Sequence, residues 1–565
     1  MAGIELAPRG PTAGREGGRV RAGDRTVTNR GSAAPRDRRR RTSFNGEVSP
    51  LAWIAAAGLT ALLGVTAPGP SPPPPQPPPQ LDDAEVRRAV DRLDGVVEAA
   101  MRRTGAPGVA VAVVHDGKVL HLKGYGVRMA GERAPVDADT VFQLASVSKP
   151  IASTVVAGAV GVEGWSEPVA PNVPDFRLKD PWVTSHVTVA DLFSHRSGLP
   201  DHAGDLLEDL GYDRAYILSH LRHEPLAPFR ASYAYTNFGL TAAAQAVADE
   251  KGVPWEKLAA DTLYKPAGMD STSSRFEDYE KAANRARGHV RSADGTWQPE
   301  FLRNPDAQSP AGGVSSTARD MAAWLRLQLA DGKLDGKQII DAEALERTHR
   351  PESVTGPPQA PAGRTAFYGL GWNVSYDDEG RLRLSHTGAF AQGAHTNVTM
   401  LPGERLGIVV LTNTSPAGVA DAVALDFFDI AQTGEVSRDW IPLVDALYQQ
   451  EADADRSKTD YAHPPSGAAP AKAAGTYAGT YANDYYGRAR VVAGDDGALT
   501  LELGPKPQTY RLTHYDGDTF SFRTAGENAV GPTGVTFTPD GKSFTVEYLD
   551  TEGLGTFTRA GATPR

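Results

Sequence analysis

The stretch that constrains this chain most is Phe142-Gln-Leu-Ala-Ser-Val-Ser-Lys-Pro150, which spaces Ser146 and Lys149 as Ser-x-x-Lys. On a helix, positions i and i+3 lie on one face, so the hydroxyl and the amine can point at the same spot. A lysine amine that its surroundings keep neutral can take the proton of a serine hydroxyl and turn it into a nucleophile. Apolar residues flank the pair on both sides, which predicts that it lies within buried surface.

Pro150 indicates where the helix begins, because a residue without an N–H is tolerated only in a helix's first turn. Ser146 is therefore expected at or near a helix N-terminus, where backbone N–H groups favour negative charge. The spacing alone is weak evidence, since a chain of this length contains about one or two such matches by chance. A solvated serine and lysine in a first turn is the ordinary alternative.

Two later segments offer the remaining groups that acyl transfer needs. In Ala234-Tyr-Thr-Asn-Phe-Gly239, Tyr235 has a phenol that can relay a proton if Lys149 lowers its pKa. Asn237 has an amide that can bind a substrate carbonyl and also orient Lys149. Taken alone, the segment is equally typical of a half-buried tyrosine beside a turn asparagine.

The second segment, Leu384-Ser-His-Thr-Gly-Ala389, is expected to form a strand at the edge of a sheet. Gly388 lacks a side chain, so a substrate can lie against the strand, and the N–H of Ala389 can pair with that of Ser146 as an oxyanion hole. His386 can donate to a substrate carboxylate or to the Tyr235 oxygen. A strand histidine that faces solvent is the alternative.

In this order, Ser-x-x-Lys, Tyr-x-Asn and His-Thr-Gly resemble the motifs of the penicillin-recognising serine enzymes. This family comprises class C β-lactamases, D-Ala-D-Ala carboxypeptidases, and related esterases and D-aminopeptidases. The resemblance covers roughly residues 84–432. Further landmarks agree with it: Val187–Pro200, Pro266–Met269, Ala311–Thr317 with Asp320, and Tyr368–Trp372. The tail, which opens with Gly475-Thr-Tyr-Ala-Gly-Thr-Tyr481, is similar to the lipocalin-like domain often appended to such enzymes.

The resemblance implies an α/β (α+β) fold of the β-lactamase/transpeptidase type, an antiparallel sheet flanked by helices with a helical subdomain. It also implies an acyl-enzyme on Ser146, with Lys149 and Tyr235 sharing the base and acid roles. The N–H groups of Ser146 and Ala389 would hold the oxyanion. The substrate would contact four residues of the later motifs, namely Asn237, His386, Thr387 and Gly388. No segment matches a glutamate-based deacylation motif. His386 stands where β-lactamases usually carry lysine, which favours a carboxypeptidase, D-aminopeptidase or esterase over an efficient β-lactamase.

Composition divides the chain into six predicted segments. Residues 1–50 hold 11 Arg and 5 acids, a net charge of 11 − 5 = +6. Because the whole chain has a net charge of −11, the other 515 residues together carry −11 − 6 = −17. Such an acidic body argues against nucleic acid as a partner. The predicted segments are a disordered basic segment (1–50), a signal peptide or signal anchor (51–67), a proline-rich linker (68–82), the hydrolase domain (83–435), a linker (436–472) and an antiparallel β-barrel (473–565).

Local patterns place the main elements. A helix from Asp82, with Val86, Leu93 and Val97 on one face, is followed by a hairpin at 109–114 and 119–125 that turns at Asp116-Gly117. A strand pair at 395–401 and 406–411 precedes a helix at 417–432, so one sheet is expected from both ends of the domain, with helices inserted between them. In the tail, short alternating runs punctuated by Asp-Gly predict a meander.

The sequence excludes several functions and leaves others open. It has no cysteine, no His-Glu-x-x-His, no Gly-x-Ser-x-Gly and no phosphate-binding glycine motif, so we expect no metal and no cofactor. The expected partner is a small-molecule or peptide substrate, and a cell-wall peptide is one candidate. We expect the protein to be exported, and then either secreted or anchored to the outer face of the cytoplasmic membrane. A β-lactamase remains an alternative, as does a surface penicillin-binding or sensor protein with little turnover. Substrate identity and oligomeric state stay open.

Overall fold

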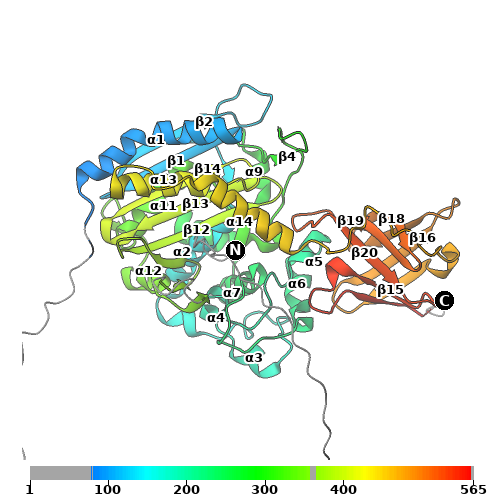
Figure 1. The fold of residues 1–565 in the computed structure, drawn as a ribbon. Helices are drawn as coiled ribbons and strands as arrows, with labels where there is room; N and C mark the ends of the chain where they lie inside the picture. The colour runs from blue at the N-terminus through cyan, green and yellow to red at the C-terminus, as the bar shows by residue number, and fades with distance from the viewer. Residues whose placement is uncertain (1–77, 79, 357–363, 562–565) are drawn as a thin grey trace, which may run out of the picture. The chain divides into compact units, whose positions relative to one another are not determined.

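The computed structural model describes residues 78, 80–356 and 364–561 (Figure 1). The predicted basic segment at 1–50, the predicted leader at 51–67 and residues 68–77 and 79 of the predicted linker lie outside the described residues. Within the described ranges, no helix combines the length and the apolar character that crossing a bilayer requires.

An eight-stranded antiparallel sheet is the centre of the larger domain, in the order β2-β1-β14-β13-β12-β11-β10-β9. Two strands come from the start of the domain and six from its end, which confirms the sheet predicted from both ends with helices between them. The strands are β1 (Gly108–His115), β2 (Lys118–Gly126), β9 (Ser353–Gly356), β10 (Ala366–Tyr368), β11 (Asn373–Tyr376), β12 (Leu382–Phe390), β13 (Ala394–Leu401) and β14 (Leu406–Thr412).

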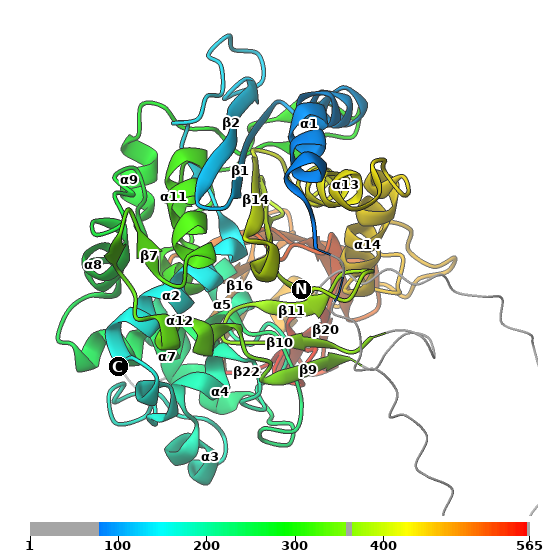
Figure 2. The same cartoon turned by 90° about the vertical axis from the view of Figure 1, so that its left-hand side faces the viewer.

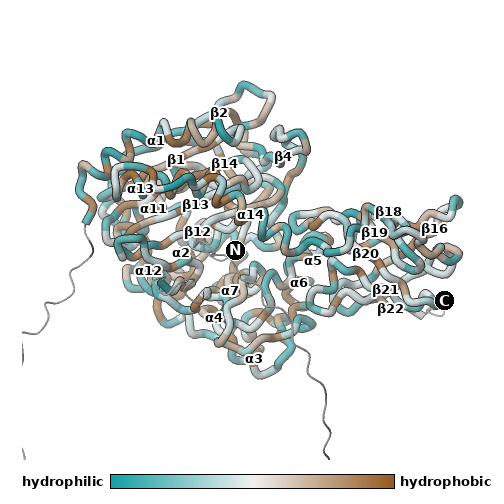
Figure 3. Tube along the Cα trace, in the orientation of Figure 1, coloured by the Kyte–Doolittle hydropathy of each residue, from teal (hydrophilic) through white to brown (hydrophobic). Residues whose placement is uncertain are grey.

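Helices cover both faces of this sheet, and β1 shows how the sequence specifies the two layers. Its residues Val109, Val111 and Val113 pack with α1 (Asp83–Thr104) and α13 (Val419–Thr433). The alternate residues of β1 face the core on the other side, beside α2 (Ser148–Val160) and α11 (Ala318–Leu329). Figure 2 shows the two helical layers on either side of β1 and β14, and the brown segments along α1 and α13 in Figure 3 mark the hydrophobic stretches. A strand covered on both faces is continuously apolar, as Val109–Val114 is.

The remaining helices between β2 and β9 build the helical subdomain, and two more follow the sheet. They are α3 (Pro181–His186), α4 (Val189–Phe193), α5 (Asp205–Asp209), α6 (Arg214–His220), α7 (Asn237–Glu250), α8 (Trp255–Ala259), α9 (Phe276–Lys281), α10 (Ser309–Gly312) and α12 (Ala342–His349), with α14 (Trp440–Ala454) after α13. Three two-stranded ribbons also belong to this region, pairing β3 (Phe142–Gln143) with β6 (Ser315–Ser316), β4 (Val290–Arg291) with β5 (Trp297–Gln298), and β7 (Lys333–Leu334) with β8 (Lys337–Gln338).

The tail forms a closed eight-stranded antiparallel barrel. Its turns at Asp496-Gly497, Asp516-Gly517 and Asp540-Gly541 each place the glycine at positive φ, which a tight hairpin turn requires. Hydrophobic and hydrophilic positions alternate along the strands in Figure 3, so apolar side chains fill the interior. The strands are β15 (Gly479–Asn483), β16 (Gly487–Ala493), β17 (Leu499–Leu503), β18 (Gln508–Asp516), β19 (Thr519–Arg523), β20 (Pro532–Phe537), β21 (Ser543–Val546) and β22 (Thr556–Arg559).

One strand differs from its prediction. The segment at 384–389, expected at the edge of a sheet, lies in β12, between β13 and β11. The edge prediction fails because three further strands, β11, β10 and β9, lie beyond it. However, β11 pairs with β12 only from Leu382 to Ser385. From His386 onward, this side of β12 therefore has no neighbouring strand among the described residues.

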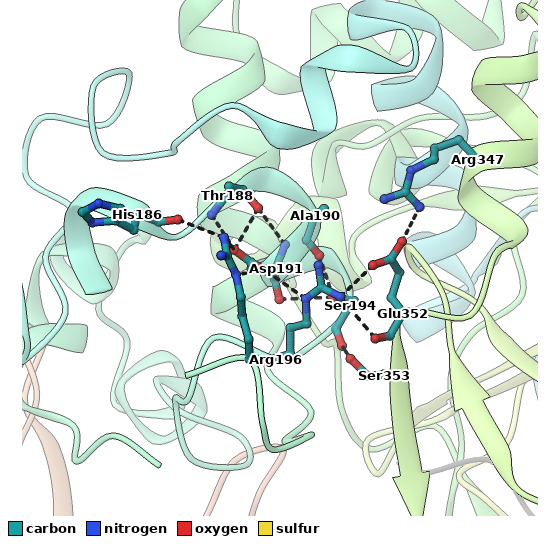
Figure 4. Close-up of polar contacts among 10 residues, drawn as sticks. His186, Thr188, Ala190, Asp191, Ser194, Arg196, Arg347, Glu352 and Ser353 are labelled. Carbon is teal, nitrogen blue, oxygen red and sulfur yellow. Dashed lines mark hydrogen bonds and ion pairs between the residues drawn. The ribbon is translucent and has the colours of Figure 1, made fainter. Parts of the chain in front are cut away.

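A buried ion-pair network supports the helical subdomain (Figure 4). Asp191, in α4, is 0% exposed, and its carboxylate accepts from Arg196 Nε at 2.9 Å and from Arg230 Nη2 at 2.7 Å. Arg196 also donates to the Glu352 carboxylate at 2.7 Å, which ties this helix to the segment just before β9. These contacts hold the pKa of Asp191 below its ordinary value despite burial. The network thus fixes the turn that carries His195.

Replacing Asp191 by alanine is expected to lower the free energy of unfolding by about 1.5–3 kcal/mol, because the change removes charge-assisted hydrogen bonds to Arg196 and Arg230, whose side chains are 22% and 47% exposed. Chemical denaturation would measure it. Asp139→Ala is a matched control, since Asp139 pairs with Arg319 at 2.6 Å where both side chains are more than half exposed. Such a surface pair contributes no more than about 1 kcal/mol. Equal effects of the two changes would contradict the assignment of Asp191 as a structural anchor.

Candidate active site

Ser146 lies in the short turn that connects β3 to α2. The turn, a 3-10 segment over Ala145–Val147, runs directly into α2 at Ser148, so Ser146 stands at the N-terminal end of that helix as predicted. The residue before it, Ala145, has φ +46°, a left-handed conformation that costs an L-residue about 1–2 kcal/mol. Ser146 is half-buried, whereas the residues of α2 from Ser148 to Ala157 are buried. The core thus holds α2 rigidly and leaves the Ser146 hydroxyl accessible.

Lys149 is entirely enclosed, at 0% exposure. Its Nζ lies 3.0 Å from Ser146 Oγ, 2.7 Å from Asn237 Oδ1 and 3.0 Å from the Ala311 carbonyl oxygen of α10. Burial lowers the pKa of Lys149 to about 7, while the charge of Asp205 works in the opposite direction. A large fraction of Lys149 is therefore neutral near neutral pH.

The contacts of Lys149 determine where a neutral amine points its lone pair. The Asn237 and Ala311 oxygens can only accept hydrogen bonds, so they take the two hydrogens of the neutral amine. The lone pair is then left for the third contact, the Ser146 hydroxyl. This is the arrangement in which the amine can remove the Ser146 proton.

Tyr235 lies beside this pair, with its ring centroid 4.5 Å from Lys149 Nζ. Burial raises the pKa of Tyr235 well above its ordinary value, and the neighbouring Ser146 hydroxyl opposes this only in part. From the sequence, we expected Lys149 to lower that pKa; the structure differs because desolvation dominates. The phenol hydroxyl is buried, and none of its contacts with the described residues has the geometry of a hydrogen bond. Tyr235 can therefore act as a proton donor near Ser146, and His195 packs against its ring at 4.5 Å between centroids.

Asn237 begins α7 and orients Lys149 through its amide oxygen. Its amide nitrogen donates to Asp205 Oδ2 at 2.8 Å, which fixes which way the amide faces. Asp205, in α5, is 3% exposed and also accepts from His202 Nδ1 at 2.8 Å. The sequence analysis did not single out Asp205, because it belongs to no motif. It is the negative charge that raises the pKa of Lys149 against burial.

Asp205→Asn is expected to shift the acid limb of the kcat/KM profile to lower pH. The change removes the charge that raises the pKa of Lys149, so the neutral amine persists to lower pH. The amide oxygen of asparagine can still accept from Asn237, so the plateau rate should fall by less than about tenfold. Ester hydrolysis measured across pH would show the shift. Asp249→Asn, which alters an exposed acid of α7, is the control; an unshifted profile in Asp205→Asn would contradict the role of its charge.

One face of β12 approaches the turn of Ser146 at Gly388. A methyl group on Gly388 would lie 2.1 Å from the Leu144 carbonyl oxygen and 3.0 Å from the backbone nitrogen of Ser146. Only glycine permits this approach. Ala389 follows directly and is 8% exposed, so the structure brings the two expected oxyanion residues, Ser146 and Ala389, onto adjoining backbone segments.

His386 and Thr387 precede Gly388 on β12, and the structure gives both an internal role. His386 Nδ1 donates to the Thr387 carbonyl oxygen at 2.9 Å, and His386 Nε2 lies 2.9 Å from the Tyr368 hydroxyl. The Thr387 hydroxyl donates to Asp421 of α13 at 2.7 Å. Burial lowers the pKa of His386 to about 3, so its ring is neutral. Among the contacts of the described residues, no hydrogen bond joins His386 to Tyr235, one of the two partners expected for it.

The loop between β19 and β20 of the barrel reaches the turn that follows β12. The Glu527 carboxylate accepts from the backbone N–H groups of Ala391 at 2.5 Å and Gln392 at 3.2 Å. Asp209, at the end of α5, accepts from the backbone N–H groups of Glu527 at 2.9 Å and Asn528 at 2.8 Å. The barrel therefore braces the turn two residues beyond Ala389.

One group of side chains among the described residues has the composition of a cation site. Ligand atoms of Asp83, His115 and Asp116 lie within 4.8 Å of one another. The Arg405 guanidinium already pairs with Asp116, so ion pairing accounts for the cluster. None of its members belongs to the Ser146 site.

Comparisons with known proteins agree with this geometry. A family model described as Beta-lactamase matches residues 93–429, and a second, described as a domain of unknown function (DUF3471), matches residues 463–552. Unguisins hydrolase ungD of Aspergillus violaceofuscus (strain CBS 115571) is 25% identical over 493 residues, which are 80% of this chain and 86% of that protein. Penicillin-binding protein 4 of Amycolatopsis lactamdurans is 28% identical over 331 residues, 57% of this chain and 84% of that protein.

Two further matches extend the comparison. D-alanyl-D-alanine-carboxypeptidase/endopeptidase AmpH of Escherichia coli (strain K12) is 23% identical over 337 residues, 58% of this chain and 85% of that protein. The octameric penicillin-binding protein homologue from Pyrococcus abyssi shares the fold, with a TM-score of 0.53 and 18% identity over 83% of this chain and 100% of that chain. Because the first family model covers more than half of the chain and spans all three motifs of the site, this chain belongs to the β-lactamase family of serine hydrolases.

Proposed function

We propose that the protein cleaves a peptide (D-amino-acid), amide or ester bond through an acyl-enzyme on Ser146. The observation that carries this proposal is the placement of Lys149. It is enclosed, its pKa is lowered to about 7, and its lone pair is directed at the Ser146 hydroxyl by two oxygens that can only accept. A lysine with these properties is a general base for a serine nucleophile.

In the acylation step, Lys149 takes the Ser146 proton as Oγ forms a bond to the substrate carbonyl carbon. The backbone N–H groups of Ser146 and Ala389 stabilise the oxyanion of the tetrahedral intermediate. When this intermediate collapses, the bond to the leaving nitrogen or oxygen breaks, and that atom receives a proton from the Tyr235 hydroxyl. The Lys149 ammonium then returns its proton to the Tyr235 oxygen, so both residues regain their starting protonation states.

Deacylation reverses these roles with water as the nucleophile. Lys149, neutral again, is the base that takes the proton of water, and the protonated Tyr235 hydroxyl lies beside it. The water oxygen bonds to the carbonyl carbon, the bond to Ser146 Oγ breaks, and Ser146 regains its proton. The names of two relatives, a D-alanyl-D-alanine-carboxypeptidase/endopeptidase and an unguisins hydrolase, support hydrolysis as the overall reaction.

Intact-mass spectrometry after exposure of the full chain to a fluorophosphonate tests the proposal. We expect one adduct on the wild type and none on Ser146→Ala, because only an activated serine attacks the phosphorus centre. Turnover of simple aryl esters should disappear in the same variant. A folded wild-type protein that remains unlabelled would refute the hydrolase. An adduct with a β-lactam that persists without turnover would instead favour the penicillin-binding or sensor alternative.

A further inference from the structure

On the strand that lies next to Ser146, the side chains of His386 and Thr387 offer no hydrogen-bond donor to a substrate carboxylate, and His386 is the first reason. Its Nδ1 faces the Thr387 carbonyl oxygen, which can only accept, so Nδ1 carries a hydrogen. The neutral ring then has a lone pair on Nε2, which accepts from the Tyr368 hydroxyl. Even a protonated ring would have both N–H groups engaged. His386 is also 1% exposed, so a substrate meets little of it.

Thr387 is the second reason. Its hydroxyl has a single hydrogen, and that hydrogen is directed at Asp421 Oδ1 at 2.7 Å. Hydrogen bonds to an ionised acceptor are the stronger kind, so this hydrogen is held in place. The half-buried Thr387 oxygen already accepts from Asn397 Nδ2 at 3.3 Å, and with its remaining lone pair it can only accept from a substrate.

The charge behind Thr387 is the third reason. Asp421 is 2% exposed, and its pKa is held below the ordinary value by His395 at 2.8 Å, with contributions from Thr387 and from Asn397 at 2.7 Å. The Tyr448 hydroxyl of α14 also donates to it at 3.0 Å. Because Asp421 is negative and His395 is neutral or positive, their summed charge is −1 or 0 and never positive. A carboxylate placed against Thr387 thus gains no electrostatic attraction there.

Two cations that the described residues place beside this strand, Lys149 and Arg303, are already engaged by other groups. Lys149 is enclosed and directs its hydrogens at internal oxygens. Arg303, whose guanidinium lies 5.2 Å from the Phe390 ring, is 8% exposed and is hydrogen-bonded to the Glu208 carboxylate. Its Nε also lies 3.9 Å from Glu527. Neither cation is available to a substrate carboxylate.

We propose that this site selects substrates whose leaving group is uncharged where it lies against His386 and Thr387, such as amides, esters or interior peptide segments. An N–H of such a group can donate to the Thr387 oxygen, whereas a free carboxylate meets only lone pairs on these two side chains and the charge of Asp421 behind them. The inference rests on the proposed function and narrows it, because it places release of a terminal amino acid with its free carboxylate among the disfavoured reactions.

A matched pair of esters tests this selectivity on the full chain. The two phenylacetylglycyl aryl esters carry the same acyl group and differ only in the leaving group, 3-hydroxybenzoate in one and 3-hydroxybenzamide in the other. Acylation of Ser146 is followed by intact mass and by phenol release, with each rate divided by that of uncatalysed hydrolysis. We expect the carboxamide ester to acylate Ser146 at least about tenfold faster. Equal rates, or a faster carboxylate ester, would overturn the inference.

The variant His386→Lys provides a second measurement. A lysine there loses both internal contacts of the histidine and can offer an ammonium to the carboxylate, so the preference for the carboxamide ester should shrink by about tenfold or more. An unchanged preference in a variant that still reacts with fluorophosphonate would contradict the role of this position. Labelling of wild-type Ser146 separates the two levels of failure. If Ser146 is labelled but the carboxamide ester is not preferred, only the inference is refuted. If Ser146 is neither labelled nor acylated by either ester, the proposed function is refuted as well.

Discussion

Replacing Lys149 by methionine is expected to lower kcat/KM by roughly 10²- to 10⁴-fold, the contribution of a positioned general base. Methionine fills a similar volume in the enclosed site but has no lone pair of comparable basicity to direct at Ser146 Oγ. Labelling by fluorophosphonate should slow in parallel, which separates loss of nucleophile activation from loss of substrate binding. Lys265→Met is a matched control, because Lys265 is 72% exposed and pairs only with Asp261 of the surface.

The pH dependence of kcat/KM provides a second test of Lys149 as the base. Lys149 acts as a base only when neutral, and its pKa is about 7, so wild-type kcat/KM should rise through about pH 7 and level off above it. In Lys149→Met, the small residual activity should lose this limb. A variant that retains both the wild-type rate and the limb would assign the base to another group, of which Tyr235 is the nearest.

The three groups around Ser146 could be predicted from the sequence because short motifs carry them. Ser146 and Lys149 share one helical face by spacing alone, and the order of the later motifs added Tyr235 and Asn237. Local backbone geometry then follows from single residues: Pro150 limits where α2 can begin, and Gly388 permits the close approach of β12. Such features are properties of a few neighbouring residues, so the sequence displays them directly.

The charges that tune these groups could not be predicted in the same way. Asp205 and Asp421 are single acids in helical segments, 32 and 34 residues from Asn237 and Thr387, and only tertiary packing brings them into contact. The contacts of His386 depend likewise on Tyr368. Tyr368 belongs to a segment that resembles the family, but nothing in the sequence indicated that it contacts His386. The central position of β12 was missed because its neighbours β10 and β11 are only three and four residues long.

Gly388→Ala is expected to lower kcat by about 10²- to 10³-fold, the cost of losing one oxyanion donor. The added methyl group would lie 2.1 Å from the Leu144 carbonyl oxygen and 2.5 Å from Thr396 Oγ1. The Leu144 oxygen cannot yield easily, since the Thr396 hydroxyl donates to it at 2.7 Å from β13. β12 must therefore move away from the Ser146 turn, and Ala389 moves with it.

Steady-state kinetics with an aryl ester, together with thermal unfolding, would separate this local displacement from general damage to the fold. Gly403→Ala is the matched control, because a methyl group on Gly403 meets nothing within 4 Å and lies in the turn between β13 and β14. Its activity should equal that of the wild type. If Gly388→Ala folds and keeps a substantial part of the wild-type kcat, the oxyanion is held by donors other than the backbone of this strand. The mechanism would then need a different partner for the Ser146 N–H.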